Sequence, residues 1–175
     1  MAKAVEQAQQ RGHKVLYRFI GATPPSSSGR ALLESLCRQI SRQYGADKAT
    51  IPSEYKDLVQ EFPKRLALAT PTQPLILFLD ALDQLSDADN ARRLTWLPAQ
   101  LPPHVRLVLS TLPGECLQAL ESKTPVHHRL EVQPLAAKDG EAVLDAWLDG
   151  VHRQLQANQK HYLLEKFAGC GLPLY

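Results

Sequence analysis

PLILFLDALDQLSD, residues 74–87, is a run of apolar residues that leads into two carboxylates. Leu75 to Leu79 are continuously apolar, which is typical of a strand in a parallel sheet that is buried on both faces. Asp80 ends this run, and Asp83 follows three residues later. A buried carboxylate is costly unless a cation or hydrogen-bond donors meet it. We therefore expect Asp80 at the end of a buried strand, beside a group that compensates its charge.

Strands and helices are predicted to alternate on both sides of this stretch. The predicted strands cover residues 14–21, 74–80, 105–111 and 127–134. The predicted helices cover residues 2–11, 29–44, 53–68, 89–97, 114–120, 137–150 and 157–168. Alternating strands and helices predict an α/β fold with a parallel sheet, in which ligands bind at the carboxyl ends of the strands. Asp80 and Ser110–Thr111 both lie at such ends.

Three details of this prediction concern packing. Pro63 should kink or divide the helix at 53–68. Alternation in the 127–134 strand should turn Leu130 and Val132 inward. The last two helices should bury a set of apolar side chains, namely Val143, Leu144, Trp147, Leu148, Tyr162, Leu163 and Phe167.

Composition excludes several classes of protein. The 175 residues suffice for one domain or a large part of one. The net charge of +2 is too small to favour nucleic acid or a membrane surface, and no apolar run approaches the length of a membrane span. Cys37, Cys116 and Cys170 are odd in number and widely spaced, as in a reduced, cytosolic chain. We predict a cytoplasmic protein with neither a nucleic-acid partner nor a membrane contact.

The two carboxylates have a chemical interpretation. A carboxylate at a rigid strand end can reach Mg²⁺ or a water bound to it beside the phosphates of a nucleotide. A second acid past the turn can orient the water that attacks the γ-phosphate. Apolar strands that end in Asp occur in many α/β proteins. On spacing alone, Asp80 can equally cap a loop or helix while Asp83 is solvated.

Several ordered segments resemble one family. LILFLDALDQLSD, residues 75–87, resembles the Walker B segment of NACHT-type ATPases, which belong to the STAND class of P-loop NTPases. Gln84 stands where many members have Glu. RLVLSTLPG at 106–114 resembles the strand that follows Walker B, and FAGCGLPLY at 167–175 resembles the GLPL motif. Residues 15–40 resemble the second strand and following helix, especially of NACHT proteins that carry WD40 or similar repeats.

This resemblance implies a fold and a set of roles. The fold would be a three-layer P-loop NTPase sheet of AAA+/STAND type, with an α/β core at about 1–135 and the start of a helical subdomain at about 136–175. The implied roles are Mg²⁺ coordination for Asp80, catalysis or water positioning for Asp83, γ-phosphate sensing for Ser110 or Thr111, and an adenine contact for Pro173. The alternatives are a helix stop at Pro173, and hydroxyls of Ser110 and Thr111 that serve only local hydrogen bonds.

One family motif does not occur in the chain. GxxxxGK[ST] is absent from the 175 residues, so the cradle of backbone N–H groups and the lysine for the β- and γ-phosphates are not encoded here. Leu112 also stands where many NACHT proteins have an arginine. We expect the middle of a NACHT domain that lacks strand 1 and is cut at both ends, and that binds ATP weakly by itself. In the family, the strands lie in the order 5-1-4-3-2, and the predicted strands at 105–111 and 127–133 would be numbers 4 and 5. Without strand 1 between them, we expect either a gap beside the 105–111 strand or a 127–133 strand shifted to close that gap.

The function implied by the resemblance is an ATP-dependent signalling switch. Its parent protein would bind and hydrolyse ATP with Mg²⁺, self-associate when nucleotide-loaded, and meet protein partners through domains outside this chain. The alternative is a scaffold that keeps the fold without catalysis. A DNA-processing ATPase is disfavoured by the weak net charge and the lack of a basic cluster. The presence or absence of a GxxxxGK[ST] motif upstream would distinguish the ATP-dependent switch from the scaffold.

Overall fold

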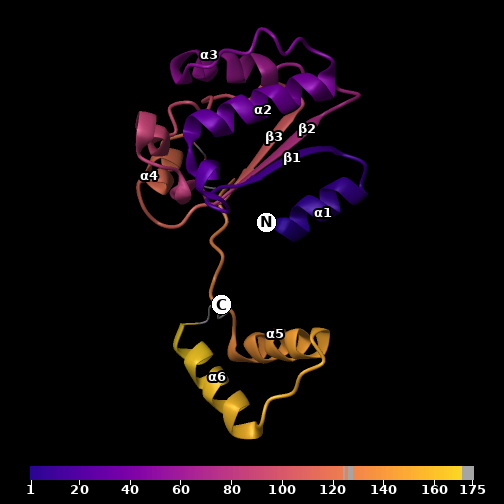
Figure 1. Ribbon diagram of the computed structural model, residues 1–175, viewed down its shortest axis with the longest axis vertical. Coiled ribbons are helices and arrows are strands. Elements are labelled where there is room, and N and C mark those ends of the chain that lie inside the picture. Colours follow the sequence, from indigo (N-terminus) through magenta and orange to yellow (C-terminus); the bar gives the residue numbers. More distant parts are fainter. Residues whose placement is uncertain (124, 126–127, 171–175) are drawn as a thin grey trace. The chain divides into compact units, whose positions relative to one another are not determined.

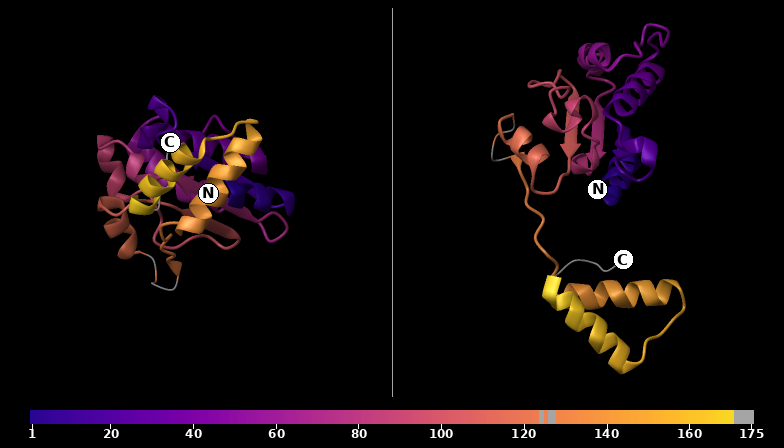
Figure 2. Two further views of the ribbon diagram at one scale, coloured as in Figure 1. Left: turned by 90° about the horizontal axis from the view of Figure 1, so that it is seen from below. Right: turned by 60° about the vertical axis from the view of Figure 1, so that its left-hand side comes forward.

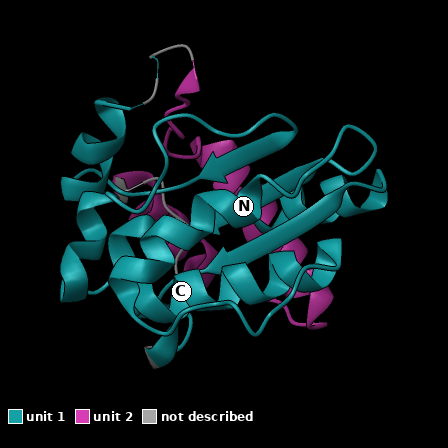
Figure 3. Ribbon diagram, turned by 90° about the horizontal axis from the view of Figure 1, so that it is seen from above, with its two compact units in different colours: residues 1–126 teal, residues 127–175 magenta. Residues whose placement is uncertain are grey.

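The chain forms two compact units, residues 1–126 and 127–175 (Figure 3). A computed structural model describes residues 1–123, 125 and 128–170 (Figure 1). The first unit contains a parallel sheet with helices, and the second contains two helices. None of the described helices is long and apolar enough to cross a membrane.

The sheet has three parallel strands in the order β1 (Lys14–Phe19), β2 (Leu75–Asp80) and β3 (Val105–Leu109). β2 is the central strand, and Leu75, Leu77 and Leu79 on it are fully buried. Phe78, on the opposite face of β2, is also buried. The prediction of a strand buried on both faces is confirmed for β2, because a continuously apolar strand is most stable where neighbours cover it on both sides.

One face of the sheet is covered by α2 (Gly29–Tyr44) and α3 (Tyr55–Leu66), which pack together (Figures 1 and 2). Ser28 caps α2, since its hydroxyl accepts the Ala31 N–H at 3.3 Å. Leu33, Leu36 and Ile40 of α2 are fully buried against the sheet and α3. The predicted bounds of this helix, 29–44, are confirmed.

The end of α3 is held by a buried arginine. Arg65 is 7% exposed and donates to Glu61 Oε1 at 2.6 Å, Ser41 Oγ at 3.0 Å and Thr50 Oγ1 at 2.6 Å. Pro63 does not divide this segment, which is one helix, so the expected division was wrong, while a kink at Pro63 stays a prediction. Packing and the bonds of Arg65 fix the last turn of α3 on α2 and outweigh the one helical hydrogen bond that a proline removes.

Shorter elements complete this unit: α1 (Ala2–Gln10), which contacts β1, then η1 (Pro24–Ser27), η2 (Leu82–Gln84), η3 (Ala88–Arg93) and α4 (Glu115–Glu121). The regular helix expected over 89–97 is wrong, because η3 is a kinked 3₁₀ segment. Side chains also donate hydrogen bonds to carbonyls in and directly after η3. The indole N–H of buried Trp96 donates to Ala91 O at 3.0 Å, and Lys123 Nζ donates to Leu94 O at 2.7 Å.

The predicted strand at 127–134 is wrong for its described part, residues 128–134, which contains no strand. Leu130 and Val132 are 89% and 88% exposed instead of facing inward. The sheet therefore ends at β3, whose outer edge pairs with no strand among the described residues. Of the two expected outcomes, an open edge beside β3 is found rather than a shifted strand. Alternation alone does not make a strand, because the backbone groups also need a partner.

The second unit pairs α5 (Ala137–Gly150) with α6 (Ala157–Cys170). Phe167 is buried against Gly140, and a Cβ at Gly140 would lie 2.1 Å from Phe167 Cε1. Lys160 Nζ lies 3.0 Å from Glu141 Oε1 and 2.8 Å from Asp145 Oδ1. The helices thus meet through one close ring contact and one group of ion pairs.

Burial in this unit differs from the prediction. Phe167 is buried as expected, but Trp147 and Tyr162 are 55% and 58% exposed. The remaining four predicted core residues are half-buried, namely Val143, Leu144, Leu148 and Leu163. Two helices that meet along a narrow seam bury only the side chains on that seam.

Candidate functional site

The candidate site lies where β2 and β3 end beside each other. Asp80 is the last residue of β2, and Ser110 directly follows β3. The pairing continues past both strands, because Ser110 N–H donates to Leu79 O at 3.0 Å and Leu82 N–H donates to Ser110 O at 2.9 Å. The structure therefore brings Asp80 and Ser110 together, as the parallel arrangement of their strands predicts.

The Ser110 side chain connects the carboxylate of Asp80 to the backbone. Its hydroxyl donates to Asp80 Oδ1, and its oxygen accepts the Ala81 N–H at 2.9 Å. Ala81 has a φ of +61°, which is uncommon for a residue other than glycine. These bonds compensate part of the charge of Asp80 and fix its side chain. The hydrogen-bond donor that meets the half-buried Asp80 is thus the Ser110 hydroxyl at the end of the neighbouring strand.

Asp83 lies on η2, directly after β2. Its Oδ1 accepts the Leu112 N–H at 3.0 Å, and its Oδ2 accepts from Gln84 Nε2 at 2.6 Å. Partial burial would raise the pKa of Asp83, but these hydrogen bonds outweigh burial and hold its pKa below the ordinary value of 3.8. Asp83 is therefore ionised at neutral pH, and its carboxylate ties η2 to the segment after β3.

A close approach between two loops shapes the same end of the sheet. Gly21 follows β1 and has a φ of +80°, and a Cβ on it would lie 2.8 Å from Gln84 Cβ. Ile20 N–H donates to Asp80 O at 3.1 Å, which fixes β1 against the end of β2. Sequence reasoning missed Gly21 as part of this site, and it noted Gln84 only as a position of the segment that resembles Walker B. The available signal was a glycine placed directly after an apolar strand.

The other predicted residues are placed as follows. Thr111 Oγ1 donates to Leu112 O at 3.1 Å, so its hydroxyl contacts the backbone of the same loop. Pro173 lies outside the described residues. Asp80, Asp83 and Ser110 thus share one rim of the sheet with Thr111 beside them, while their roles toward a nucleotide stay predictions.

The donor set of this rim fits magnesium. Within the described part of the chain, no group of three or more His, Cys, Asp or Glu side chains could hold a metal ion. Mg²⁺ in phosphate-binding enzymes needs only one or two carboxylates, because waters and phosphate oxygens complete its shell. One oxygen of Asp80 accepts from Ser110, and the other accepts no hydrogen bond from the described residues. Asp80 is therefore suited to present one carboxylate oxygen to such an ion.

Comparison with known proteins identifies the family of the chain. Residues 1–150 match the NACHT domain family. The chain is 37% identical over 164 residues to mouse "NACHT and WD repeat domain-containing protein 2", covering 92% of this chain and 9% of that protein. It is 32% identical over 184 residues to human "NACHT domain- and WD repeat-containing protein 1", covering 99% of this chain and 12% of that protein.

A third relative is mouse "Telomerase protein component 1", 30% identical over 178 residues, which cover 92% of this chain and 6% of that protein. The chain spans between 6% and 12% of the length of these relatives. Its three-stranded parallel sheet with flanking helices is consistent with the core of a P-loop NTPase. With most of its length matched, the chain belongs to the NACHT domain family of P-loop NTPases.

Proposed function

We propose that the full-length protein is a nucleotide-dependent signalling switch that binds and hydrolyses ATP with Mg²⁺ and self-associates when loaded. The observation that carries this proposal is the arrangement of Asp80, Asp83 and Ser110 on one rim of a parallel sheet, where ligands of α/β proteins bind. Family membership supports nucleotide chemistry at this rim. Protein partners would bind domains outside the 175 residues, as the repeat-containing relatives suggest.

Each side chain has a distinct role in this proposal. Mg²⁺, when bound, would neutralise charge on the nucleotide phosphates. Asp80, fixed by Ser110, would present its second oxygen to the ion or to a water bound to it. Asp83 is ionised and anchored by Leu112 N–H, so it would orient the attacking water.

The hydroxyls of Ser110 and Thr111, which follow β3, differ in the hydrogen bonds that a phosphate would have to replace. The hydrogen of Ser110 is engaged by Asp80, whereas Thr111 donates to the neutral carbonyl of Leu112 at 3.1 Å, and a weaker contact with Asp83 helps to lower the pKa of that carboxyl. Breaking the weaker local bond costs less, so Thr111 is the better γ-phosphate contact of the two. An adenine contact for Pro173 remains part of the same proposal. The chain alone, without GxxxxGK[ST], should bind ATP weakly.

The test uses the full-length protein with Asp80→Asn, Asp83→Asn and the control Asp89→Asn. Asp89 is exposed, and its φ of +58° is one that asparagine tolerates. Asp80→Asn should abolish the gain in ATP affinity that Mg²⁺ provides. Asp83→Asn should keep ATP binding and lower kcat by roughly a hundredfold, since a water-positioning group acts mainly in the transition state. Asp89→Asn should match the wild type.

Two results would contradict the proposal. Unchanged turnover in Asp83→Asn would remove Asp83 from the mechanism. A full-length protein that binds no nucleotide, with or without Mg²⁺, would instead identify a scaffold that keeps the fold without catalysis.

A further inference from the structure

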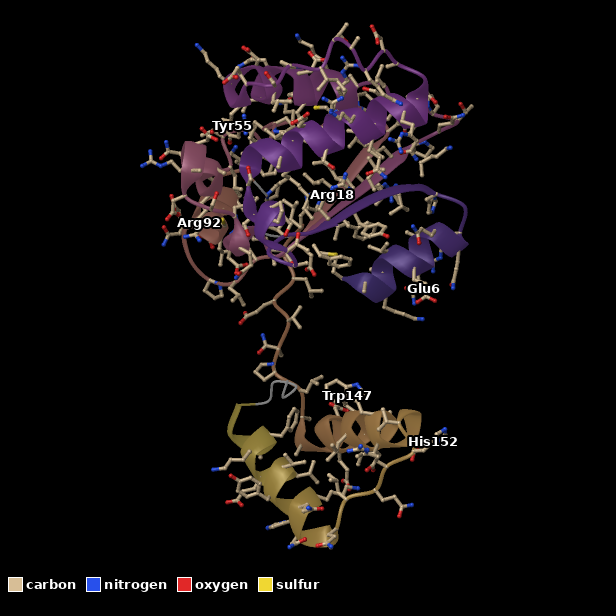
Figure 4. The ribbon with its side chains drawn as sticks, in the orientation of Figure 1. Glu6, Arg18, Tyr55, Arg92, Trp147 and His152 are labelled. Atoms are coloured by element: carbon tan, nitrogen blue, oxygen red, sulfur yellow. The ribbon has the colours of Figure 1, made fainter. Side chains whose placement is uncertain are left out.

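The strand β1 has an arginine on its core-facing side. Side chains two residues apart on a strand share a face, so Leu16, Arg18 and Ile20 point the same way. Leu16 and Ile20 are 2% and 4% exposed, and Arg18 between them is half-buried. β1 is an edge strand, and Figure 4 labels Arg18 beside α2. A cation therefore occupies a place where the pattern of the strand would put an apolar residue.

Every hydrogen-bond partner of Arg18 is neutral. Its Nη1 donates to Tyr17 O at 2.7 Å, and its Nη2 donates to Ser35 Oγ at 2.6 Å and Gln39 Oε1 at 2.8 Å. No carboxylate within the described ranges forms an ion pair with it, in contrast to buried Arg65, which pairs with Glu61. Three of the five N–H donors that a guanidinium carries are thereby used. Burial lowers the pKa of Arg18.

Arg18 lines an open pocket together with one face of α2. The other lining residues lie on successive turns of that helix: Ala31, Glu34, Ser35, Arg38, Gln39 and Arg42. We call this pocket the arginine groove. Arg38 Nη2 lies 2.7 Å from Glu34 Oε1, and Arg42 forms no ion pair or hydrogen bond with the described residues. Three arginines thus face one glutamate, which leaves an excess of positive charge around the groove.

We propose that the arginine groove binds a phosphoryl group. A phosphate monoester carries nearly two negative charges and three acceptor oxygens, whereas a carboxylate carries one charge and two oxygens. The planar guanidinium fork matches phosphate oxygens in pairs, and several forks around one pocket favour the ligand with more oxygens and more charge. The groove shares no residue with the rim formed by Asp80, Asp83 and Ser110. It is therefore a second anion site, independent of the proposed nucleotide site.

Titration of the 175-residue chain followed by NMR of the arginine Nε–Hε groups tests this proposal. The probes are inorganic phosphate, a phosphoserine peptide, and the same peptide with glutamate in place of phosphoserine. Saturable shifts are expected at Arg18, Arg38 and Arg42 with phosphoryl probes, weakening as salt rises. Tighter binding of the phosphopeptide than of inorganic phosphate would identify a phosphorylated protein partner as the source. Equal binding would identify a small phosphorylated molecule.

Matched substitutions in α2 distinguish phosphate binding in the arginine groove from a general effect of positive charge on affinity. Arg42→Gln should weaken phosphopeptide binding roughly tenfold, the loss expected for one charge-assisted hydrogen bond. Glu34→Gln should strengthen binding several-fold, because it removes the acidic side chain of the groove and frees Arg38. Arg30→Gln, an exposed arginine on the same helix outside the groove, should leave the affinity unchanged. All three substitutions put glutamine at exposed or half-buried helix positions, where it is a good helix former.

Four outcomes would overturn the proposal: no saturable shift with any phosphoryl probe, equal binding of the glutamate peptide, equal weakening by Arg30→Gln, or loss of binding in Asp80→Asn. The last result would place the bound phosphate at the strand ends rather than in the arginine groove.

Discussion

The Ser110 side chain fixes the orientation of the Asp80 carboxylate, and the sequence alone does not show this contact. The hydroxyl of Ser110 donates to the carboxylate and accepts from Ala81 N–H, so one side chain holds both the aspartate and the turn after it. Asp83 is similarly held, through Leu112 N–H. At this scale, the candidate site is a set of hydrogen bonds between the ends of two strands.

Ser110→Ala tests this coupling. The substitution removes a bond to a carboxylate and leaves Ala81 N–H without its acceptor, so it should lower the free energy of unfolding by about 1–3 kcal/mol. Ser122→Ala is the matched control, because the exposed Ser122 hydroxyl donates to Ala119 O at 2.9 Å at the end of α4, and its loss should cost less than about 0.5 kcal/mol. Urea unfolding of both variants measures the difference. Equal stability of the two would mean that Ser110 does not hold the turn.

Helices and strands in this chain form where their apolar pattern meets a partner. α2 and α3 have apolar faces that pack on β2, and their predicted positions hold to within a few residues. The alternating segment 128–134 has the pattern of a strand, but it joins no sheet among the described residues and is not a strand. In the second unit, α5 and α6 meet through the close contact between Gly140 and Phe167 and through the ion pairs of Lys160.

Gly140→Ala should loosen α5 from α6. The added Cβ would lie 2.1 Å from the buried ring of Phe167, so the ring or the helix must move. An overpacking cost of about 1–3 kcal/mol should exceed the gain of about 1 kcal/mol in helix propensity. Amide hydrogen exchange in α5 and α6 should therefore become faster. Gly150→Ala is the control, since a Cβ there meets nothing within 4 Å, and it should leave exchange unchanged or slower. Slower exchange in Gly140→Ala would show that the contact with Phe167 is not limiting.

The chain consists of a sheet-containing unit, residues 1–126, and a helical unit, residues 127–175, in which an extended segment, residues 129–136, precedes α5. Residues 129–136 contain neither helix nor strand, and Leu130 and Val132 within them are almost fully exposed. The division lies between residues 126 and 127. Each unit therefore has its own set of packed side chains, with Phe167 in the second and the β2 leucines in the first.

Limited digestion with trypsin should reveal this organisation. Arg129 lies at the start of the extended segment, whereas Arg106 is also exposed but lies within β3, whose backbone pairs with β2. A protease needs a locally extended backbone, so cleavage after Arg129 should precede cleavage after Arg106. Mass spectrometry should detect fragments 1–129 and 130–175 early in the digest. Earlier cleavage after Arg106 would indicate that β3, at the open edge of the sheet, is the less stable part.

The sequence by itself determined the class of fold and the position of the site. A continuously apolar strand ending in Asp80, a second strand ending at Ser110, and helices of regular period require a parallel sheet with polar residues at its carboxyl edge. These features are local, because periodicity and strand ends are written in consecutive residues.

Only the tertiary structure decided which polar groups meet. The bond from Ser110 to Asp80 joins residues 30 positions apart, and the bond from Arg18 to Gln39 joins residues 21 positions apart. The exposure of Trp147 and the missing strand at 128–134 likewise depend on which neighbours are present. Burial and hydrogen bonding are properties of surroundings that distant segments supply, so a pattern along the chain does not specify them.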